Sequence, residues 1–187
     1  MSHNYLLNTS FHQSLLAFDF DTARQVQAKN CNHCGGLLHQ AHYPRLGFGV
    51  PSELASLYQS RYSFCCAQCR KRTTPPSLRF FGRRRYIAPL FLLLCSVRFS
   101  PCEKRCERWA KRRGIQLSLS TWKRWVSWWQ RDFPQTPFWS IAKACFLPPL
   151  NVNPSLRALL KSLAGKVLPQ QLTQLLQFLS PLSIDAR

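Results

Sequence analysis

Residues 63–85 read SFCCAQCRKRTTPPSLRFFGRRR. This stretch places three cysteines within five residues, and arginines and lysines follow them at once. It contains a C-x2-C pair, Cys66 and Cys69, and an earlier pair, Cys31 and Cys34, stands directly before a Gly-Gly dipeptide. Such a turn, a knuckle, presents two thiolates from one tight loop, and two knuckles together supply the four ligands that tetrahedral zinc requires. The spacing therefore predicts a zinc ribbon in which Cys31, Cys34, Cys66 and Cys69 bind one Zn²⁺ ion.

Two alternatives to this ligand set stay open in the sequence. Cys65 also forms a C-x3-C pair with Cys69, although the spacing favours Cys66 as the ligand and Cys65 as a neighbour in the core. Three histidines could replace a thiolate, although four cysteines already complete the set: His33, His39 and His42. A redox role for the first pair is disfavoured, because a thioredoxin-type pair follows a strand and opens a helix, and the Gly-Gly dipeptide breaks a helix.

The composition indicates a folded chain with an anionic partner. Of 187 residues, 45% are hydrophobic and 13% are aromatic, which argues against a disordered chain. The chain has 26 Lys and Arg against 7 Asp and Glu, a net charge of +19, and 18 of the 26 lie between Arg61 and Arg131. Such a field repels itself unless an anionic partner neutralises it. This favours nucleic acid, with an anionic membrane surface and a solvated basic surface as the alternatives.

Seven cations follow the second knuckle up to residue 85: three directly after it, then Arg79, and a second group of three at 83–85. The first three offset the negative charge of a zinc–thiolate centre, but the second three lie beyond that centre. We expect the two groups together to form a phosphate-binding track. Its residues are Arg70, Lys71, Arg72, Arg83, Arg84 and Arg85.

The sequence predicts no membrane association and a reducing compartment. Met1–Thr9 lacks the basic start and apolar run of a signal peptide. The apolar stretch Tyr86–Phe99 is too short for a bilayer, which needs about 20 residues, so we expect a buried helix there. Nine cysteines without an export signal indicate metal binding rather than disulfides. We expect a cytoplasmic protein that associates with the nucleoid through its nucleic-acid partner.

Two further helices follow the apolar one. Residues 100–103, Ser-Pro-Cys-Glu, form a helix start with Ser100 as the N-cap, and Gly114 is a favourable residue to end that helix. Ser120 is the expected N-cap of the next helix, which runs until Pro134. Helix, glycine turn and helix with a cationic outer face predict a helix-turn-helix.

The second of these helices separates an apolar face from a polar one. Trp122, Trp125, Val126 and Trp129 recur at i, i+3, i+4 and i+7, which is the spacing of a core-facing stripe. The remaining residues are the candidate contacts to DNA, although Trp128 also suits packing against another element. These candidates are Thr121, Lys123, Arg124, Ser127, Trp128 and Arg131.

The order of these motifs resembles the N-terminal DNA-binding part of bacterial insertion-sequence transposases that carry a zinc ribbon. Besides the paired C-x2-C motifs and the basic run, the similar points are Phe64 before the second knuckle, the threonines at 73–74, and a strand with Phe80 and Phe81 that leads into the apolar helix. The resemblance covers roughly residues 31–139. It implies a ribbon and a helix-turn-helix that bind the ends of a mobile element, followed by a catalytic domain with an Asp-Asp-Glu triad.

The carboxylates of this chain do not follow that pattern beyond Trp139. Two-metal phosphoryl transfer needs several carboxylates around ions about 3.5–4 Å apart. Asp19 and Asp21 would share a face if extended, but no pattern places a third acid near them. We therefore expect no enzyme, but an accessory or targeting factor in transposition. The acids are Asp19, Asp21, Glu53, Glu103, Glu107, Asp132 and Asp185.

The predicted fold class is α+β, with a small zinc-ribbon sheet followed by a mainly helical region. We expect an N-terminal helical segment at 1–28, the zinc ribbon at 29–85, the helix-turn-helix region at 86–139 and a C-terminal helical hairpin at 140–187. Leucines at 156–163 and 168–179 mark the helices of the hairpin, which packs on the core or docks a protein from the same mobile element. Double-stranded DNA is the expected partner. RNA or a ribonucleoprotein is the alternative, because single-stranded bases stack on exposed aromatic rings beside arginines.

Overall fold

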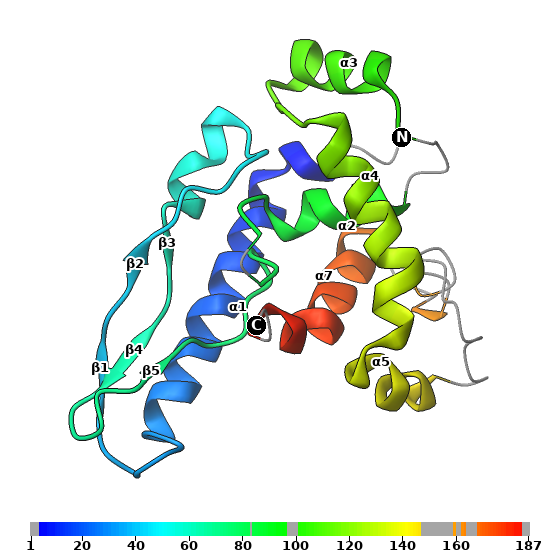
Figure 1. The fold of residues 1–187 in the computed structure, drawn as a ribbon. Coiled ribbons are helices and arrows are strands. Elements are labelled where there is room, and N and C mark those ends of the chain that lie inside the picture. The colour runs from blue at the N-terminus through cyan, green and yellow to red at the C-terminus, as the bar shows by residue number, and fades with distance from the viewer. Residues whose placement is uncertain are drawn as a thin grey trace.

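The structure, a computed structural model, describes residues 4–82, 84–96, 101–146, 159, 162–163 and 168–184. It combines a small antiparallel sheet region with several helices (Figure 1), so the predicted α+β class is confirmed at this level. The boundaries of the four predicted segments stay predictions.

The strands form a narrow antiparallel arm, which we define as residues 38–73. In one sheet the strand order is β1-β4-β5, with Leu38 opposite Cys66 and Phe64 opposite Thr73. In the other sheet β2 pairs with β3, and the 3₁₀ helix η2 (Ser52–Tyr58) joins them at the far end of the arm (Figure 1). The strands are β1 (Leu38–Gln40), β2 (Tyr43–Pro44), β3 (Ser60–Arg61), β4 (Phe64–Cys66) and β5 (Arg72–Thr73).

One expected strand is not formed. Phe80 and Phe81 do not belong to any strand, and Phe80 makes only an isolated bridge to Ile87. Both rings are buried in the main core instead. The prediction of a strand here was therefore wrong, because the rings are buried by packing against helices rather than by pairing in a sheet.

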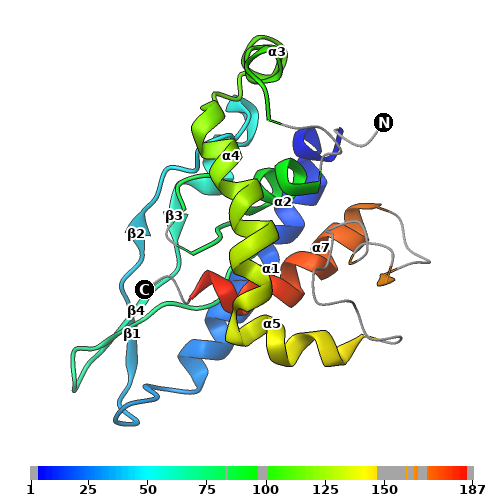
Figure 2. The same ribbon diagram turned by 45° about the vertical axis from the view of Figure 1, so that its right-hand side comes forward.

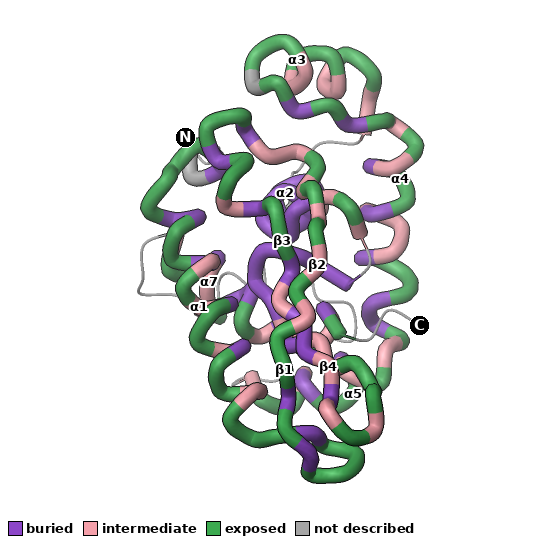
Figure 3. Tube along the Cα trace, turned by 90° about the vertical axis from the view of Figure 1, so that its left-hand side faces the viewer, coloured by how far each residue is buried: buried purple, intermediate pink, exposed green. Residues whose placement is uncertain are grey.

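Helix α1 (Thr9–Ala28) lies along the arm (Figures 1 and 3) and confirms the helix expected in this part of the chain. The side chain of Asn8 caps it by accepting a hydrogen bond from the amide of Phe11 at 2.9 Å. Its inner side buries Phe11, Leu15 and Ala23. The helix therefore supports the arm along its length.

A buried ion pair joins α1 to the segment that follows the arm. Asp19 accepts hydrogen bonds from the hydroxyl of Ser77 at 2.6 Å, from the amide of Leu78 at 2.7 Å and from Nε of Arg79 at 2.8 Å. Arg79 also donates to the backbone carbonyl oxygens of Leu57 and Ser60, which belong to the arm. Since Asp19 and Arg79 are 0% and 1% exposed, this network fixes the position of the arm against the helix.

Helix α2 (Ala88–Ser96) lies at the centre of the main core. It is apolar on all sides, and the tube in Figure 3 shows it enclosed by the other elements. Helices α4 (Leu119–Ser127) and α7 (Leu168–Leu179) pack on it (Figure 2). Both α2 and α7 confirm expected helices, whereas the other expected C-terminal helix, at 156–163, lies largely outside the described residues.

The two helices of the predicted helix-turn-helix are present with shifted starts. Helix α3 (Glu103–Arg113) has Cys102 as its N-cap, so the prediction that the helix starts at Ser100 was wrong, and Ser100 itself lies outside the described residues. Gly114 ends α3 in the left-handed conformation, with φ 62°, as expected. The hydroxyl of Ser118, rather than that of Ser120, caps α4 by accepting from the amide of Thr121 at 3.2 Å.

The helical path of α4 continues until Pro134. A π-helical turn, η3 (Trp128–Asp132), follows α4, and η4 (Phe133–Gln135) follows that. Trp122, Trp125 and Trp129 are buried, so the predicted apolar face is confirmed. Other short helices are η1 (Asn4–Leu7), α5 (Pro137–Ala142), η5 (Lys143–Cys145) and η6 (Ser180–Ser183).

Candidate metal centre and cationic surface

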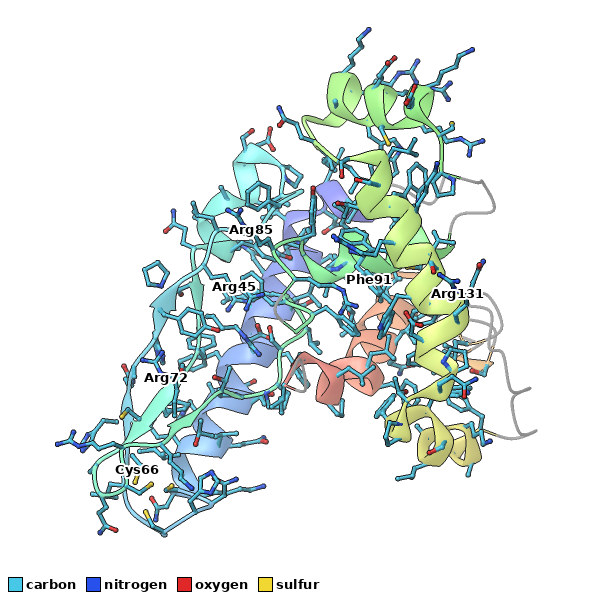
Figure 4. All side chains as sticks on the ribbon, viewed as in Figure 1. Arg45, Cys66, Arg72, Arg85, Phe91 and Arg131 are labelled. Carbon is cyan, nitrogen blue, oxygen red and sulfur yellow. The ribbon has the colours of Figure 1, made fainter. Side chains whose placement is uncertain are left out.

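The two knuckles have matching backbones at the free end of the arm, where Figure 4 shows their sulfur atoms gathered near Cys66. Gly35 and Arg70 hold the same place in the two turns, four residues after the first cysteine. Both adopt the left-handed conformation, with φ 73° and 58°. Their amides donate to the carbonyl oxygens of Cys31 at 2.8 Å and Cys66 at 3.2 Å. Each turn is therefore closed by the same backbone hydrogen bond.

The four predicted cysteines converge on one point. The Sγ atoms of Cys31, Cys34, Cys66 and Cys69 all lie within 4.8 Å of one another. The Sγ atoms of Cys31 and Cys69 are 3.6 Å apart, and those of Cys34 and Cys66 are 3.4 Å apart. A tetrahedral site with Zn–S bonds near 2.3 Å needs sulfur atoms about 3.8 Å apart. The four thiols form a candidate metal site, and its geometry suits a tetrahedral ion.

Backbone amides favour the thiolate form of two of these cysteines, Cys66 and Cys31. The N–H of Cys69 is the largest cause that lowers the pKa of Cys66, to about 6, helped by the N–H of Gln68 and opposed by burial. The N–H of His33 is the largest cause that lowers the pKa of Cys31. Since the thiolate is the form that binds a metal, the knuckles prepare these ligands through their own backbone.

Strand register decides between Cys65 and Cys66. Successive side chains of a strand point to opposite faces, so only one of two adjacent cysteines can face the first knuckle. Cys66 is fully buried and belongs to the cluster. The thiol of Cys65 is instead directed at the carbonyl oxygen of Arg70, at 3.5 Å. The candidate metal site therefore contains Cys66 and not Cys65.

The histidines lie apart from the cysteine cluster. His33 and His39 are exposed, and no histidine of the described chain joins the four thiols. His42 shares a hydrogen bond with the backbone of Ser63, with Nδ1 3.0 Å from the carbonyl oxygen and 3.2 Å from the amide nitrogen. Its ring packs edge-on against Tyr62 and Phe64, so it is a packing residue of the arm.

Gly36 belongs to the site because no larger side chain fits at its position. A Cβ atom at this position would lie 3.0 Å from Sγ of Cys66 and 2.9 Å from the side chain of Gln68. The close approach of the first knuckle to the second therefore requires glycine here.

The first three cations of the predicted track are exposed on the second knuckle. Arg70, Lys71 and Arg72 all face solvent, and Figure 4 places Arg72 on the arm above Cys66. The guanidinium of Arg72 lies 5.8 Å from the ring centre of Tyr43. These side chains are available to a ligand.

The second three cations differ from the first. Arg84 is half-buried, with its guanidinium 4.6 Å from the ring centre of Trp128, 5.0 Å from Phe81 and 5.1 Å from Phe91. Arg85 is exposed and lies 4.1 Å from the ring centre of Phe48. Arg83 lies outside the described residues. Arg84 is therefore committed to packing, and its burial lowers the pKa of its guanidinium.

The candidate contacts on α4 and η3 fall into two groups. Lys123 and Arg124 are exposed, and Arg131 is exposed with its guanidinium bonded to the hydroxyl of Ser127 (Figure 4). Thr121 is half-buried and accepts a hydrogen bond from the hydroxyl of Ser118 at 2.8 Å. Trp128 is half-buried against Phe81, Phe91 and Phe133, so packing accounts for it.

Comparison with known protein families, with curated proteins and with solved structures finds no match to this chain. Within the described ranges, no helix has the length and apolar character that crossing a membrane requires.

Proposed function

We propose that this protein binds double-stranded DNA, and that one zinc ion on Cys31, Cys34, Cys66 and Cys69 fixes the end of the arm. Four thiolates at tetrahedral spacing suit Zn²⁺. The ion holds two turns that are 35 residues apart in the chain, and structural zinc supplies folding energy directly. The proposal assigns the chain no catalytic step.

The observation that supports DNA binding is that exposed cations lack acidic partners within the described residues. Lys123 and Arg124 on α4 have no acidic partner within the described chain, and the same holds for Arg70 and Lys71 on the second knuckle. The ion pair between Asp19 and Arg79 is buried and leaves the surface charge unchanged. A surface with this excess of unpaired cations is the electrostatic footprint of a nucleic-acid-binding protein.

Duplex DNA is favoured over single strands by the positions of the aromatic rings. All six tryptophans lie within the described residues, and none is exposed. The exposed phenylalanine rings of the described chain are Phe20 and Phe48. An arginine already lies over each of them, Arg24 over Phe20 and Arg85 over Phe48. Binding of single strands depends on free stacking platforms, which this surface offers poorly.

In this proposal α3, Gly114 and α4 act as a helix-turn-helix, with Lys123 and Arg124 of α4 directed at the major groove. The role as an accessory factor in transposition rests on the resemblance of the motifs described above. It is a narrower proposal than DNA binding, and it requires a preference for one DNA sequence.

Competition between nucleic acids tests the proposal. A fluorescein-labelled DNA duplex is bound to the zinc-loaded protein, and unlabelled duplex DNA, single-stranded DNA and double-stranded RNA of the same sequence compete for it. We expect duplex DNA to compete best, and affinity to fall steeply with salt. Failure to bind any duplex at 50 mM salt would contradict the proposal, and stronger competition by single strands or RNA would transfer it to that ligand.

A further inference from the structure

Helix α3 carries a stripe of cations that none of the predicted sites includes. Its exposed cations are Lys104, Arg108, Lys111 and Arg112, spaced i, i+4, i+7 and i+8. With 3.6 residues per turn, these positions share one face of the helix. All four side chains face solvent, so the stripe forms a continuous charged surface about 12 Å long at 1.5 Å per residue.

The opposite side of α3 fixes the direction of the stripe. Cys106 and Trp109 are half-buried and pack against the main core. They lie on the far side of the helix from Lys104 and Arg108, because about 100° separates successive residues. Figures 1 and 2 show α3 standing at one end of the molecule, beyond the start of α4. The stripe therefore points away from the body.

Among the described residues, no acid forms an ion pair with this stripe. Glu103 and Glu107 are exposed on the neighbouring flank of the same helix, and neither forms an ion pair with a described residue. Glu107 stands four residues before Lys111, which is the spacing at which helix pairs form. Lys104, Arg108, Lys111 and Arg112 likewise have no acidic partner within the described part of the chain.

Because Arg84 packs against aromatic rings, other cations are needed to contact phosphates, and the stripe on α3 can supply them. Arg84 was predicted to contact phosphates, yet its guanidinium lies among the rings of Phe81, Phe91 and Trp128. The cations that α3 presents are held only by their own helix. They can reach a ligand without giving up contacts that stabilise the fold.

We infer that α3 lies against the phosphate backbone of a DNA duplex, and that its four exposed cations supply a large share of the ionic contacts. This inference rests on the proposed function and names the surface that performs it. Each strand of a duplex has one phosphate per about 3.4 Å of the axis, so a stripe of about 12 Å meets about three to four phosphates on one strand, which is nearly one per cation. Such contacts position the duplex and do not read its sequence.

An anionic membrane is the competing ligand for a cationic helix, and the structure disfavours it. A helix that binds a bilayer inserts its apolar face among the lipid chains. The apolar face of α3 packs on the core through Cys106 and Trp109, and the face turned outward is charged. The free side of α3 therefore suits a phosphate backbone in water.

The test compares three variants that each remove two positive charges. The variants K104Q/R108Q and K111Q/R112Q act on α3, and glutamine preserves helix propensity. The control R24Q/K143Q acts on α1 and beside α5, at the opposite end of the molecule from α3 (Figure 1). Circular dichroism melting and zinc content confirm that each variant is folded before DNA affinity is measured from 50 to 200 mM salt.

We expect each α3 variant to reduce the slope of log affinity against log salt by about 1.8, because each phosphate contact contributes about 0.9. When salt rises fourfold, from 50 to 200 mM, each α3 variant should therefore lose about 12-fold less affinity for DNA than the natural protein loses. The control should leave the slope unchanged. Slopes of the α3 variants equal to that of the control, with tight binding by the natural protein, would overturn the inference and leave the proposed function intact.

Two other outcomes would also overturn the inference, each for a different reason. If the natural protein binds no duplex, the proposed function itself is wrong, and the inference falls with it. If the natural protein binds vesicles containing phosphatidylserine more tightly than duplex DNA, and the α3 variants lose that binding, the stripe is a membrane contact and the inference is overturned.

Discussion

Replacement of Asp19 by asparagine tests the buried joint between α1 and the arm. The change preserves shape but removes the charge, and an amide can accept hydrogen bonds through only one of its two terminal atoms. Asp19 receives three hydrogen bonds, two of them on Oδ2 and one on Oδ1. Either Leu78 or the pair of Ser77 and Arg79 therefore loses its acceptor in Asp19→Asn.

The magnitude follows from the burial of the partner. Arg79 is 1% exposed, so in Asp19→Asn its guanidinium is buried without a counter-ion. Removal of one partner of a buried ion pair costs about 3–5 kcal/mol of unfolding free energy. For a chain of this size, that corresponds to a fall in Tm of about 6–20 °C.

Urea and thermal unfolding of the zinc-loaded protein measure this cost. Asp21→Asn is the matched control, because Asp21 is exposed two residues along the same helix and should change the unfolding free energy by less than about 0.5 kcal/mol. An Asp19→Asn protein as stable as the Asp21→Asn protein would refute the argument, since it would mean that the ion pair does not support the fold.

Three further predictions concern single side chains. Arg84→Ala should lower the unfolding free energy by about 1–3 kcal/mol through lost ring contacts and change the salt dependence of DNA binding little; unchanged stability with a reduced salt slope would return Arg84 to the phosphate track. Gly36→Ala should weaken zinc binding, measured by competition with a chelator, because its Cβ would meet Sγ of Cys66 at 3.0 Å; an unchanged zinc affinity would contradict the close approach. Burial lowers the pKa of His12 below its usual 6.5, so the unfolded chain binds the extra proton first and stability should fall as pH decreases below about 6.5. His12→Gln should flatten that pH dependence in urea unfolding, and an equally steep dependence in the variant would exclude His12 as its source.

The parts of the structure that depend on local pattern could be predicted from the sequence. The continuous apolar run at α2 and the periodic tryptophans on α4 are strong local signals, and a helix forms in each of these segments. The paired C-x2-C motifs identified the cysteine cluster for the same reason, since each knuckle is a short local turn. Gly114 ended α3 because its αL conformation is a property of the residue itself.

The parts that depend on contacts between distant residues could not be predicted. Asp19 meets Arg79 across 60 positions of sequence, and no pattern in either segment indicates the pairing. In the sequence Arg84 cannot be told from the arginines on either side of it, and its role follows only from the rings of Phe91 and Trp128 beside it. The stripe on α3 was visible as spacing in the sequence, but its direction away from the core follows only from the packing of Trp109.

The arm and its proposed function depend most on one metal ion held by four cysteines. The zinc content per chain tests directly whether that ion is bound. Elemental analysis of the purified natural protein, of Cys65→Ser and of Cys66→Ser gives the metal and its stoichiometry in one measurement. The two altered residues are adjacent, but only Cys66 belongs to the cluster. We predict one zinc per chain in the natural protein and in Cys65→Ser, and a loss of zinc in Cys66→Ser. A natural protein that contains no zinc, or a Cys66→Ser protein that retains it in full, would contradict the account.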